Sequence, residues 1–192
     1  MRIGVLALQG DFAEHEVMLR SLGADVAQVR LPQHLTDLDG LIIPGGESTT
    51  IGKLAEAYGL IEPLQRFGAQ RAIWGTCAGA IFLSRDIHRQ QPLLGLMDIV
   101  VSRNAFGRQV DSFEASMDAP FLTHTGEEAR PFRAVFIRAP IIESVGAKAS
   151  VLMQLPDNRI VAARQGKLLA TSFHPELTGD TRFHRYFMEL AR

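Results

Sequence analysis

The sequence is poor in cysteine, in net charge and in long apolar runs. Its single cysteine among 192 residues cannot form an intrachain disulfide, so nothing requires an oxidising compartment. Lysine and arginine number 20 against 21 acidic residues, and this near balance lacks the basic excess expected for binding nucleic acid or an anionic membrane. No apolar run approaches the roughly 20 residues of a transmembrane helix. We therefore expect a cytoplasmic protein with no nucleic-acid or membrane partner.

The remaining composition is that of an ordinary globular protein, with 46% hydrophobic and 21% charged residues. The apolar N-terminal segment, residues 1–8, is short and has no small-residue cleavage site, which favours a buried strand over a signal peptide. No repeat, low-complexity tract or linker interrupts the chain. Its length predicts one domain spanning residues 1–192.

The first half alternates between strand and helix patterns. We expect strands at residues 3–8, 24–29, 40–43 and 72–74, and helices at 12–22, from 48 or 49 to about 58, and 60–70. Asp11 is the expected N-cap of the first helix, and Ser48 or Thr49 that of the second. This alternation predicts a parallel sheet with helices on both faces.

The second half is richer in strands. We expect them at residues 99–102, 109–117, 133–138, 150–155, 159–165 and 167–173, followed by a closing helix at 180–190. Turn residues at 156–158 and 165–166 join consecutive strands into hairpins. The predicted fold class is therefore α/β, a three-layer sandwich with a mostly parallel central sheet and antiparallel hairpin strands.

Cys77 lies in the sequence Gly75-Thr76-Cys77-Ala78-Gly79, between two apolar runs. A nucleophile framed by glycines at a strand-to-helix junction is held on a sharp turn with its side chain exposed above the sheet. The first N–H groups of the new helix point at the sulfur and favour its thiolate form. A lone cysteine is often a buried apolar side chain, but the glycine frame favours a nucleophile.

A cysteine thiol is mostly protonated at neutral pH, so this nucleophile needs a base. Of six histidines, His174 stands out because Pro175 and Glu176 follow it at the end of a predicted strand. Residues two apart in extended chain point the same way, so Glu176 is expected to reach the outer ring nitrogen of His174. We predict that Cys77, His174 and Glu176 act as nucleophile, base and orienting acid.

The other histidines lack such partners. We expect them to be solvated or hydrogen-bonded, and their spacing predicts no metal site; they are His15, His34, His88, His124 and His184.

A second motif, Pro44-Gly45-Gly46-Glu47-Ser48, leaves the end of a strand and enters a helix, where ligands bind in open α/β sheets. We predict that the backbone N–H groups of Gly46 and Ala78 form an oxyanion hole. The alternative is a tight turn with a helix cap behind it. The spacing of Gly46 and Gly52 does not match a phosphate loop, which excludes nucleotide binding there.

These motifs, in this order and at these separations, resemble the class I, triad-type glutamine amidotransferases. Longer segments are similar to one branch, the glutaminase subunit of pyridoxal phosphate synthase, and the resemblance spans residues 3–190. The segments that carry it are residues 8–10, 44–50, 103–114, 136–140 and 172–178. Two residues depart from the pattern: Ala105 stands where we expect serine, and Trp74 where phenylalanine is commoner.

The resemblance implies hydrolysis of L-glutamine to glutamate and ammonia through a thioester, without a cofactor or metal. It implies that ammonia passes to a barrel-shaped synthase subunit, in a hetero-oligomer that makes pyridoxal phosphate, and that docking raises a weak basal activity. The implied glutamine-binding residues are Gly46, Glu47, Ser48, Arg103, Ile137 and Arg138. From the residues alone, Arg103 and Arg138 are better interpreted as ordinary surface arginines, so their assignment rests on the resemblance.

Two further positions stay open. Gln9 is either a simple loop residue or one that orders the diglycine loop on docking, and the segment 107–109 is either a turn or part of the docking surface. Two rival functions also remain. One is another thiol hydrolase on the same architecture, peptidase-like or deglycase-like, and the other is a binding module that has lost turnover.

Overall fold

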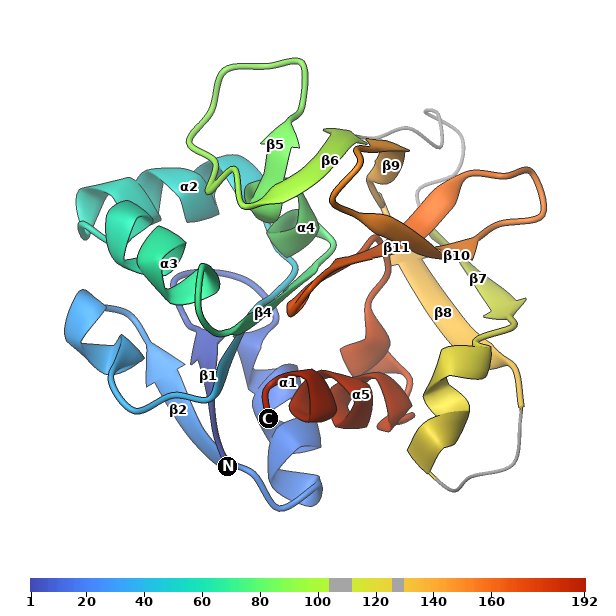
Figure 1. Cartoon of the computed structure of the whole chain (residues 1–192), viewed down its shortest axis with the longest axis horizontal. Helices are drawn as coiled ribbons and strands as arrows, with labels where there is room; N and C mark the ends of the chain where they lie inside the picture. Colours follow the sequence, from blue (N-terminus) through green and yellow to red (C-terminus); the bar gives the residue numbers. More distant parts are fainter. Residues whose placement is uncertain (104–111, 126–129) are drawn as a thin grey trace.

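The computed structural model of the chain describes residues 1–103, 112–125 and 130–192. Its centre is a ten-stranded sheet in the order β2-β1-β3-β4-β12-β11-β9-β6-β5, with β10 paired to β11 (Figure 1). Its strands are β1 (Arg2–Leu6), β2 (Asp25–Val29), β3 (Gly40–Ile43), β4 (Ala72–Thr76), β5 (Ser84–Asp86), β6 (Met97–Ser102), β9 (Ile141–Val145), β10 (Ser150–Gln154), β11 (Ile160–Gln165) and β12 (Leu168–Thr171). A separate two-stranded sheet pairs β7 (Ser112–Met117) with β8 (Phe132–Ile137).

Strand direction divides the large sheet into two halves. Strands β2, β1, β3, β4 and β12 are all parallel, and the register of the last pair sets Thr171 opposite Thr76. From β11 onward the pairs β12–β11, β11–β9 and β9–β6 are antiparallel. Because parallel strands end at the same edge of a sheet, the residues that follow β3, β4 and β12 meet there. This edge carries the residues singled out by the sequence.

Helices cover both faces of the sheet. Helices α1 (Phe12–Ser21) and α5 (Arg182–Leu190) lie on one face, and α2 (Ser48–Ala57), α3 (Ile61–Gly68) and α4 (Ala78–Leu83) on the other (Figure 1). Each layer has its own apolar core. Leu19 and Phe187 pack with Ile42 of β3 on the first face, whereas Ile51 packs with Leu41 on the second. The alternation of Leu41 and Ile42 is the period of a strand buried on both sides.

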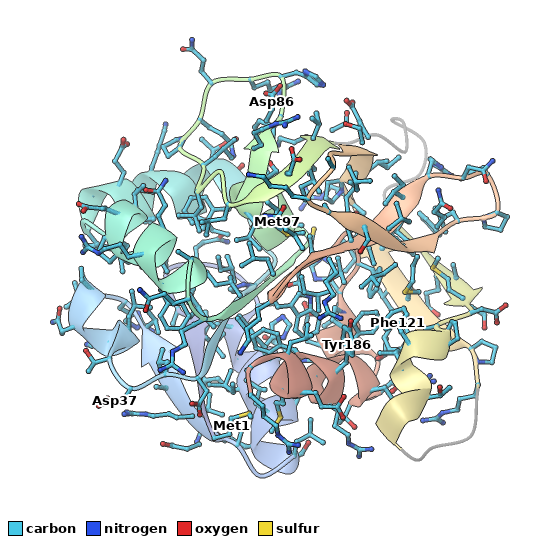
Figure 2. All side chains as sticks on the ribbon, in the orientation of Figure 1. Met1, Asp37, Asp86, Met97, Phe121 and Tyr186 are labelled. Carbon is cyan, nitrogen blue, oxygen red and sulfur yellow. The ribbon has the colours of Figure 1, made fainter. Side chains whose placement is uncertain are left out.

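Aromatic side chains pack between the small two-stranded sheet and α5. The short helix η2 (Pro120–Thr125) places Phe121 against Tyr186, with ring centroids 5.2 Å apart (Figure 2). Phe183 of α5 contacts Phe121, Phe132 and Phe173. Burying such rings stabilises the fold by several kcal/mol in total, at roughly 1.5–3 kcal/mol each. This packing holds β8 beside the segment that follows β12.

The predicted α/β fold with helices on both faces is confirmed. Strands β5 and β9 and the three short 3-10 helices were not expected; β5 has only three residues and too little pattern to detect. Glu47, and neither Ser48 nor Thr49, caps α2. The start of the expected strand 109–117 and the segment 107–109 lie outside the described residues. No helix in the described part of the chain has the length and apolar character to cross a membrane.

Candidate active site

Cys77 occupies a strained turn between β4 and α4. Its backbone has φ 47° and ψ −105°, a conformation that a residue with a side chain rarely adopts. Its N–H donates to the carbonyl of Thr171 at 2.7 Å, which anchors the turn to β12. Gly79 packs directly on the carbonyl of Ile43, where any Cβ would collide. The absent side chain therefore brings the start of α4 against the end of β3, as a nucleophile elbow requires.

His174 and Glu176 form a short hydrogen bond behind this turn. The distance from His174 Nδ1 to Glu176 Oε1 is 2.7 Å, and the two side chains are only 5% and 0% exposed. The expected geometry of extended chain is wrong here. Glu176 lies in the 3-10 turn η3 (Pro175–Leu177), and the turn folds its carboxylate back onto the imidazole.

The remaining ring nitrogen of His174, Nε2, is left for the thiol of Cys77. Burial lowers the pKa of His174, but hydrogen bonds with Cys77 and Glu176 outweigh this and raise the pKa to about 10. Burial raises the pKa of Glu176, and the hydrogen bond from His174 opposes that rise. A protonated imidazole beside the carboxylate favours the anionic form of Glu176.

The diglycine loop lies against the His174 ring. A Cβ on Gly45 would stand 2.5 Å from His174 Cε1, so only glycine fits beside the imidazole. Gly46 has φ +145°, a region open to glycine alone. The next N–H, that of Glu47, donates to Gln9 Oε1 at 2.7 Å. Gln9 therefore contacts the loop directly.

The Glu47 carboxylate caps α2. It accepts from the N–H groups of Thr49 and Thr50 at 3.2 and 2.7 Å and from Arg103 Nη2 at 2.9 Å. Partial burial raises its pKa, but the bonds from Thr50, Thr49 and Arg103 outweigh this and lower the pKa to about 2. These bonds commit the Glu47 carboxylate to the helix end and to Arg103, which leaves it poorly placed to receive a substrate ammonium.

Arg103 links the loop to a residue that the sequence analysis missed. Its Nη1 donates to Thr49 Oγ1 at 3.1 Å and to Gln91 Oε1 at 3.2 Å. Gln91 lies between strands in a segment without any motif, so no local signal marks it. The buried Ser48 hydroxyl has no hydrogen-bond partner within the described ranges.

Ile137 and Arg138 lie at the end of β8, which runs past His174. The His174 N–H donates to the carbonyl of Val135 at 2.8 Å, two residues before Ile137. Both side chains are exposed, and Arg138 has φ +42°. Among the residues described, no hydrogen bond joins either one to Cys77 or His174. The structure thus gathers Gly46, Glu47, Ser48 and Arg103 at the diglycine loop and sets Ile137 and Arg138 on a second element.

The other histidines fall into two groups. His15 and His184 are fully buried and hydrogen-bonded to each other. The prediction that these histidines are solvated or hydrogen-bonded therefore holds for them in its second form only. His34 Nδ1 accepts from the N–H of Arg30, and His88 is exposed beside Glu143. The side chain of His124 lies outside the description.

Within residues 1–103, 112–125 and 130–192, one cluster has donor atoms close enough for a metal ion. Ligand-type atoms of Asp11, His174 and Glu176 lie within 4.8 Å of one another. The bond from His174 Nδ1 to Glu176 needs a proton on that nitrogen, and a ring nitrogen cannot hold a proton and a metal ion together. The geometry therefore fits a hydrogen-bonded pair.

A thiol on a strand–turn–helix elbow, followed by an imidazole and a buried carboxylate, is the arrangement of thiol-dependent acyl-transfer sites on α/β sheets. Comparison with known proteins agrees with this class. The chain belongs to the SNO glutamine amidotransferase family, whose sequence model matches residues 5–192.

Similar proteins extend over the full length. The chain is 60% identical to "pyridoxal 5'-phosphate synthase subunit PdxT" of Herpetosiphon aurantiacus, over 99% of this chain and 100% of the relative. It is 58% identical to the protein of the same name from Pelotomaculum thermopropionicum, over 98% and 94% of the two chains. A crystal structure of a glutamine amidotransferase superposes with a TM-score of 0.91 at 50% identity, over 98% of both chains. PurLQS from Thermotoga maritima, with a TM-score of 0.70 at 15% identity over 100% and 98%, shares the fold.

Proposed function

We propose that this chain hydrolyses L-glutamine to L-glutamate and ammonia and delivers the ammonia to a synthase subunit that makes pyridoxal 5'-phosphate. The observation that carries the proposal is the buried row of Cys77, His174 and Glu176 at the edge where β3, β4 and β12 end. Membership of the glutamine amidotransferase family supports glutamine as the substrate. The names of the relatives support the synthase partner.

The first half-reaction forms a thioester. The Cys77 thiolate attacks the carbon of the glutamine side-chain amide, and the N–H groups of Gly46 and Ala78 stabilise the oxyanion that develops. His174 then donates its Nε2 proton to the departing nitrogen. The C–N bond breaks and ammonia leaves.

The second half-reaction restores the enzyme. His174, now neutral, takes a proton from a water molecule while the water oxygen attacks the thioester carbon. The C–S bond breaks, glutamate leaves, and the proton on His174 again faces a thiolate. Glu176 stays ionised throughout and holds the imidazole in the tautomer that presents Nε2 to sulfur.

Recognition of the amino-acid part of glutamine falls to the edge of the site. Arg103 uses three acceptors in the protein, and the guanidinium carries five N–H donors, so donors remain for a substrate carboxylate. Ser48, with a hydroxyl that lacks a partner among the described residues, offers a further hydrogen bond. Gly46 and Glu47 shape the loop, and Ile137 and Arg138 close the site from β8.

The proposed reaction needs neither a cofactor nor a metal ion in this chain, since the thiol, the imidazole and the backbone amides carry out each of its steps. We propose that residues 1–192 work as one domain. The single cysteine, which cannot form an intrachain disulfide, supports a cytoplasmic setting.

The test is ammonia release by the chain reconstituted with a barrel-shaped synthase subunit. We expect release from glutamine and none from asparagine or peptides, with faster turnover in the complex than for the chain alone. Cys77→Ala should lower turnover by at least about 10³-fold, because the nucleophile is gone. The exposed histidine variant His88→Gln is the matched control and should keep wild-type turnover. Full turnover by Cys77→Ala would exclude the mechanism.

A further inference from the structure

A second row of buried polar atoms lies behind Glu176. His15 Nε2 is 3.4 Å from Glu176 Oε2 and 3.2 Å from Thr76 Oγ1. His15 Nδ1 is 2.9 Å from His184 Nε2. Both imidazoles have no exposed surface, and they come from α1 and α5, two helices far apart in the sequence. Trp74 packs its ring edge-on against both of them.

We propose that His15 and His184 are positioning residues for the reaction: His184 fixes the tautomer of His15, and His15 presents an N–H to the second oxygen of Glu176. That contact keeps Glu176 an anion directed at His174. The inference deepens the proposed function and rests on the role given there to Cys77, His174 and Glu176.

Proton counting selects one arrangement of this row. If His15 carries its proton on Nε2, it faces Glu176 Oε2 with a donor, and its bare Nδ1 accepts from His184 Nε2. His15 Nε2 then lies 3.4 Å from Oε2, which is an electrostatic contact and not a hydrogen bond, and its nearer neighbour is Thr76 Oγ1 at 3.2 Å. His184 Nδ1 has no partner among the described residues. The opposite tautomer places the lone pair of His15 Nε2 against Oε2, and with either tautomer Oε2 and His184 Nδ1 are among the buried atoms that lack hydrogen-bond partners in the described structure. Since an N–H attracts the carboxylate and a lone pair repels it, the first arrangement is the stable one.

Charge favours the same arrangement. Burial, and then the neighbouring His184 and His174, lower the pKa of His15 well below its usual value. Burial lowers the pKa of His184 to about 3. Both rings are therefore neutral at neutral pH. A neutral donor stabilises the Glu176 anion without adding a positive charge that would compete with protonated His174.

Packing alone does not account for two histidines at this position. Burying an imidazole without full hydrogen bonding is costly, and apolar side chains would fill the same volume at less expense. Instead, His15 faces Glu176 Oε2, the oxygen of that carboxylate that has no hydrogen-bond partner among the described residues. The polar atoms are placed where the triad needs a donor.

The test is the pH dependence of Cys77 alkylation by iodoacetamide, followed by mass spectrometry of the full chain. Cys77 is the only cysteine, so every adduct reports this thiol. His15→Gln keeps an amide N–H near the position of Nε2, whereas the shorter His15→Asn keeps a partner for His184 and loses the contact with Glu176. We expect His15→Asn to slow alkylation at pH 6 by about tenfold, the size of effect expected when a buried carboxylate loses a neighbouring N–H. His15→Gln should stay near the wild-type rate, and the difference between the two variants should shrink as the pH rises.

A double-mutant cycle separates positioning from a general loss of structure. In a Glu176→Gln background, His15→Asn should slow alkylation no further, because the carboxylate on which it acts is gone. Equal rates for folded His15→Asn and wild type would overturn the proposal, and so would an undiminished His15→Asn effect in the Glu176→Gln background. His88→Gln, an exposed histidine variant, is the control.

If His15→Asn does not fold, a second pair of variants decides. His184→Gln keeps a donor for His15 Nδ1 and His184→Leu removes it, so slower alkylation of His184→Leu than of His184→Gln supports the proposal and equal rates overturn it. Alkylation needs neither glutamine nor a partner subunit. A wild-type complex that releases no ammonia would therefore refute the proposed function without deciding the alkylation result.

Discussion

Two parts of the site are stabilised in different ways. One is the buried row of Cys77, His174, Glu176, His15 and His184, and the other is the charged rim at the start of α2, made of Glu47 and Arg103. In the row, the His174, Glu176 and His15 side chains are at most 5% exposed, and His15 comes from α1, far in sequence from the other two. In the rim, the side chains of Glu47 and Arg103 are 47% and 24% exposed. The rim combines local and distant contacts, since Glu47 is bound by the two threonines that follow it and by Arg103, 56 residues away.

This difference separates chemistry from recognition. In the low-dielectric interior each hydrogen bond moves a proton equilibrium strongly, and the geometry depends on the packing of α1, α5 and β12 together. At the rim, solvent screens the ion pair of Glu47 with Arg103, so it orients side chains with little effect on stability. Substitutions that disturb the row should therefore slow the chemical step, whereas those at the rim should weaken substrate binding.

The substitution with the largest expected effect is Gly45→Ala, because Gly45 of the diglycine loop packs directly against His174 of the buried row. The new methyl group would stand 2.5 Å from His174 Cε1 and push the imidazole away from the thiol. We expect glutamine turnover to fall by about 10²-fold, since a displacement of about 1 Å at a reacting group costs that much. Steady-state kinetics of the complex measure this.

Gly68→Ala is the matched control for that substitution. Its Cβ would meet the side-chain ends of Leu96 and Ile73 at 2.6 and 2.9 Å, equally tight but far from the site. It should lower the melting temperature and leave the turnover per folded molecule unchanged. A Gly45→Ala enzyme with normal turnover would show that the loop does not set the position of His174.

Arg103→Ala tests the rim with a smaller expected effect. Loss of the guanidinium removes the bonds to Glu47, Thr49 and Gln91 and, in our proposal, a partner of the substrate carboxylate. KM for glutamine should rise by about tenfold with kcat nearly constant, as expected when one charge-assisted hydrogen bond is lost. Arg103→Lys should recover part of the loss, because it keeps the charge without the planar fork. A drop in kcat at unchanged KM would instead place Arg103 in the chemical step.

The sequence revealed the row only where its members are marked by neighbours. Cys77 lies in a glycine frame and His174 is followed by Pro175 and Glu176, so local patterns suffice to predict them. No local pattern marks His15, which contacts Glu176 on the side away from His174. His15 and His184 are 169 residues apart and meet only because α1 and α5 share one face of the sheet.

At the rim, by contrast, a prediction made from the local sequence is wrong because a distant residue changes which side chain caps α2. Serine and threonine are better N-caps than glutamate, which is why Ser48 or Thr49 was expected at the start of α2. The structure uses Glu47 because Arg103, 56 residues away, binds the same carboxylate. The 3-10 turn at Pro175–Leu177 is likewise set by tertiary contacts of Glu176 and not by the strand that precedes it.

The pH dependence of stability separates the two regions by their titration windows. His184 has a pKa of about 3 in the folded chain, and His15 is also lowered, both chiefly by burial, whereas an unfolded histidine titrates near 6.5. Below about pH 6.5 the unfolded chain binds more protons, so their contribution is complete above that pH and is lost as the pH falls. As the pH falls from 7 to 6, each of these two histidines should raise the unfolding equilibrium constant by about threefold, whereas His174, with its pKa raised to about 10, should lower it by a similar factor. Urea unfolding at the two pH values measures this.

Glu47 should act in a lower window. Its pKa is lowered to about 2, so its contribution is present above the unfolded value of 4.5 and is lost as the pH falls toward 2. His184→Leu should therefore flatten the stability curve between pH 7 and 6 and leave the loss below pH 4.5 in place. His88→Gln should not flatten it, because Glu143 raises the pKa of His88 and such a group stabilises the fold on the acid side. An unchanged slope in His184→Leu would mean that the buried row does not carry the acid sensitivity of the fold.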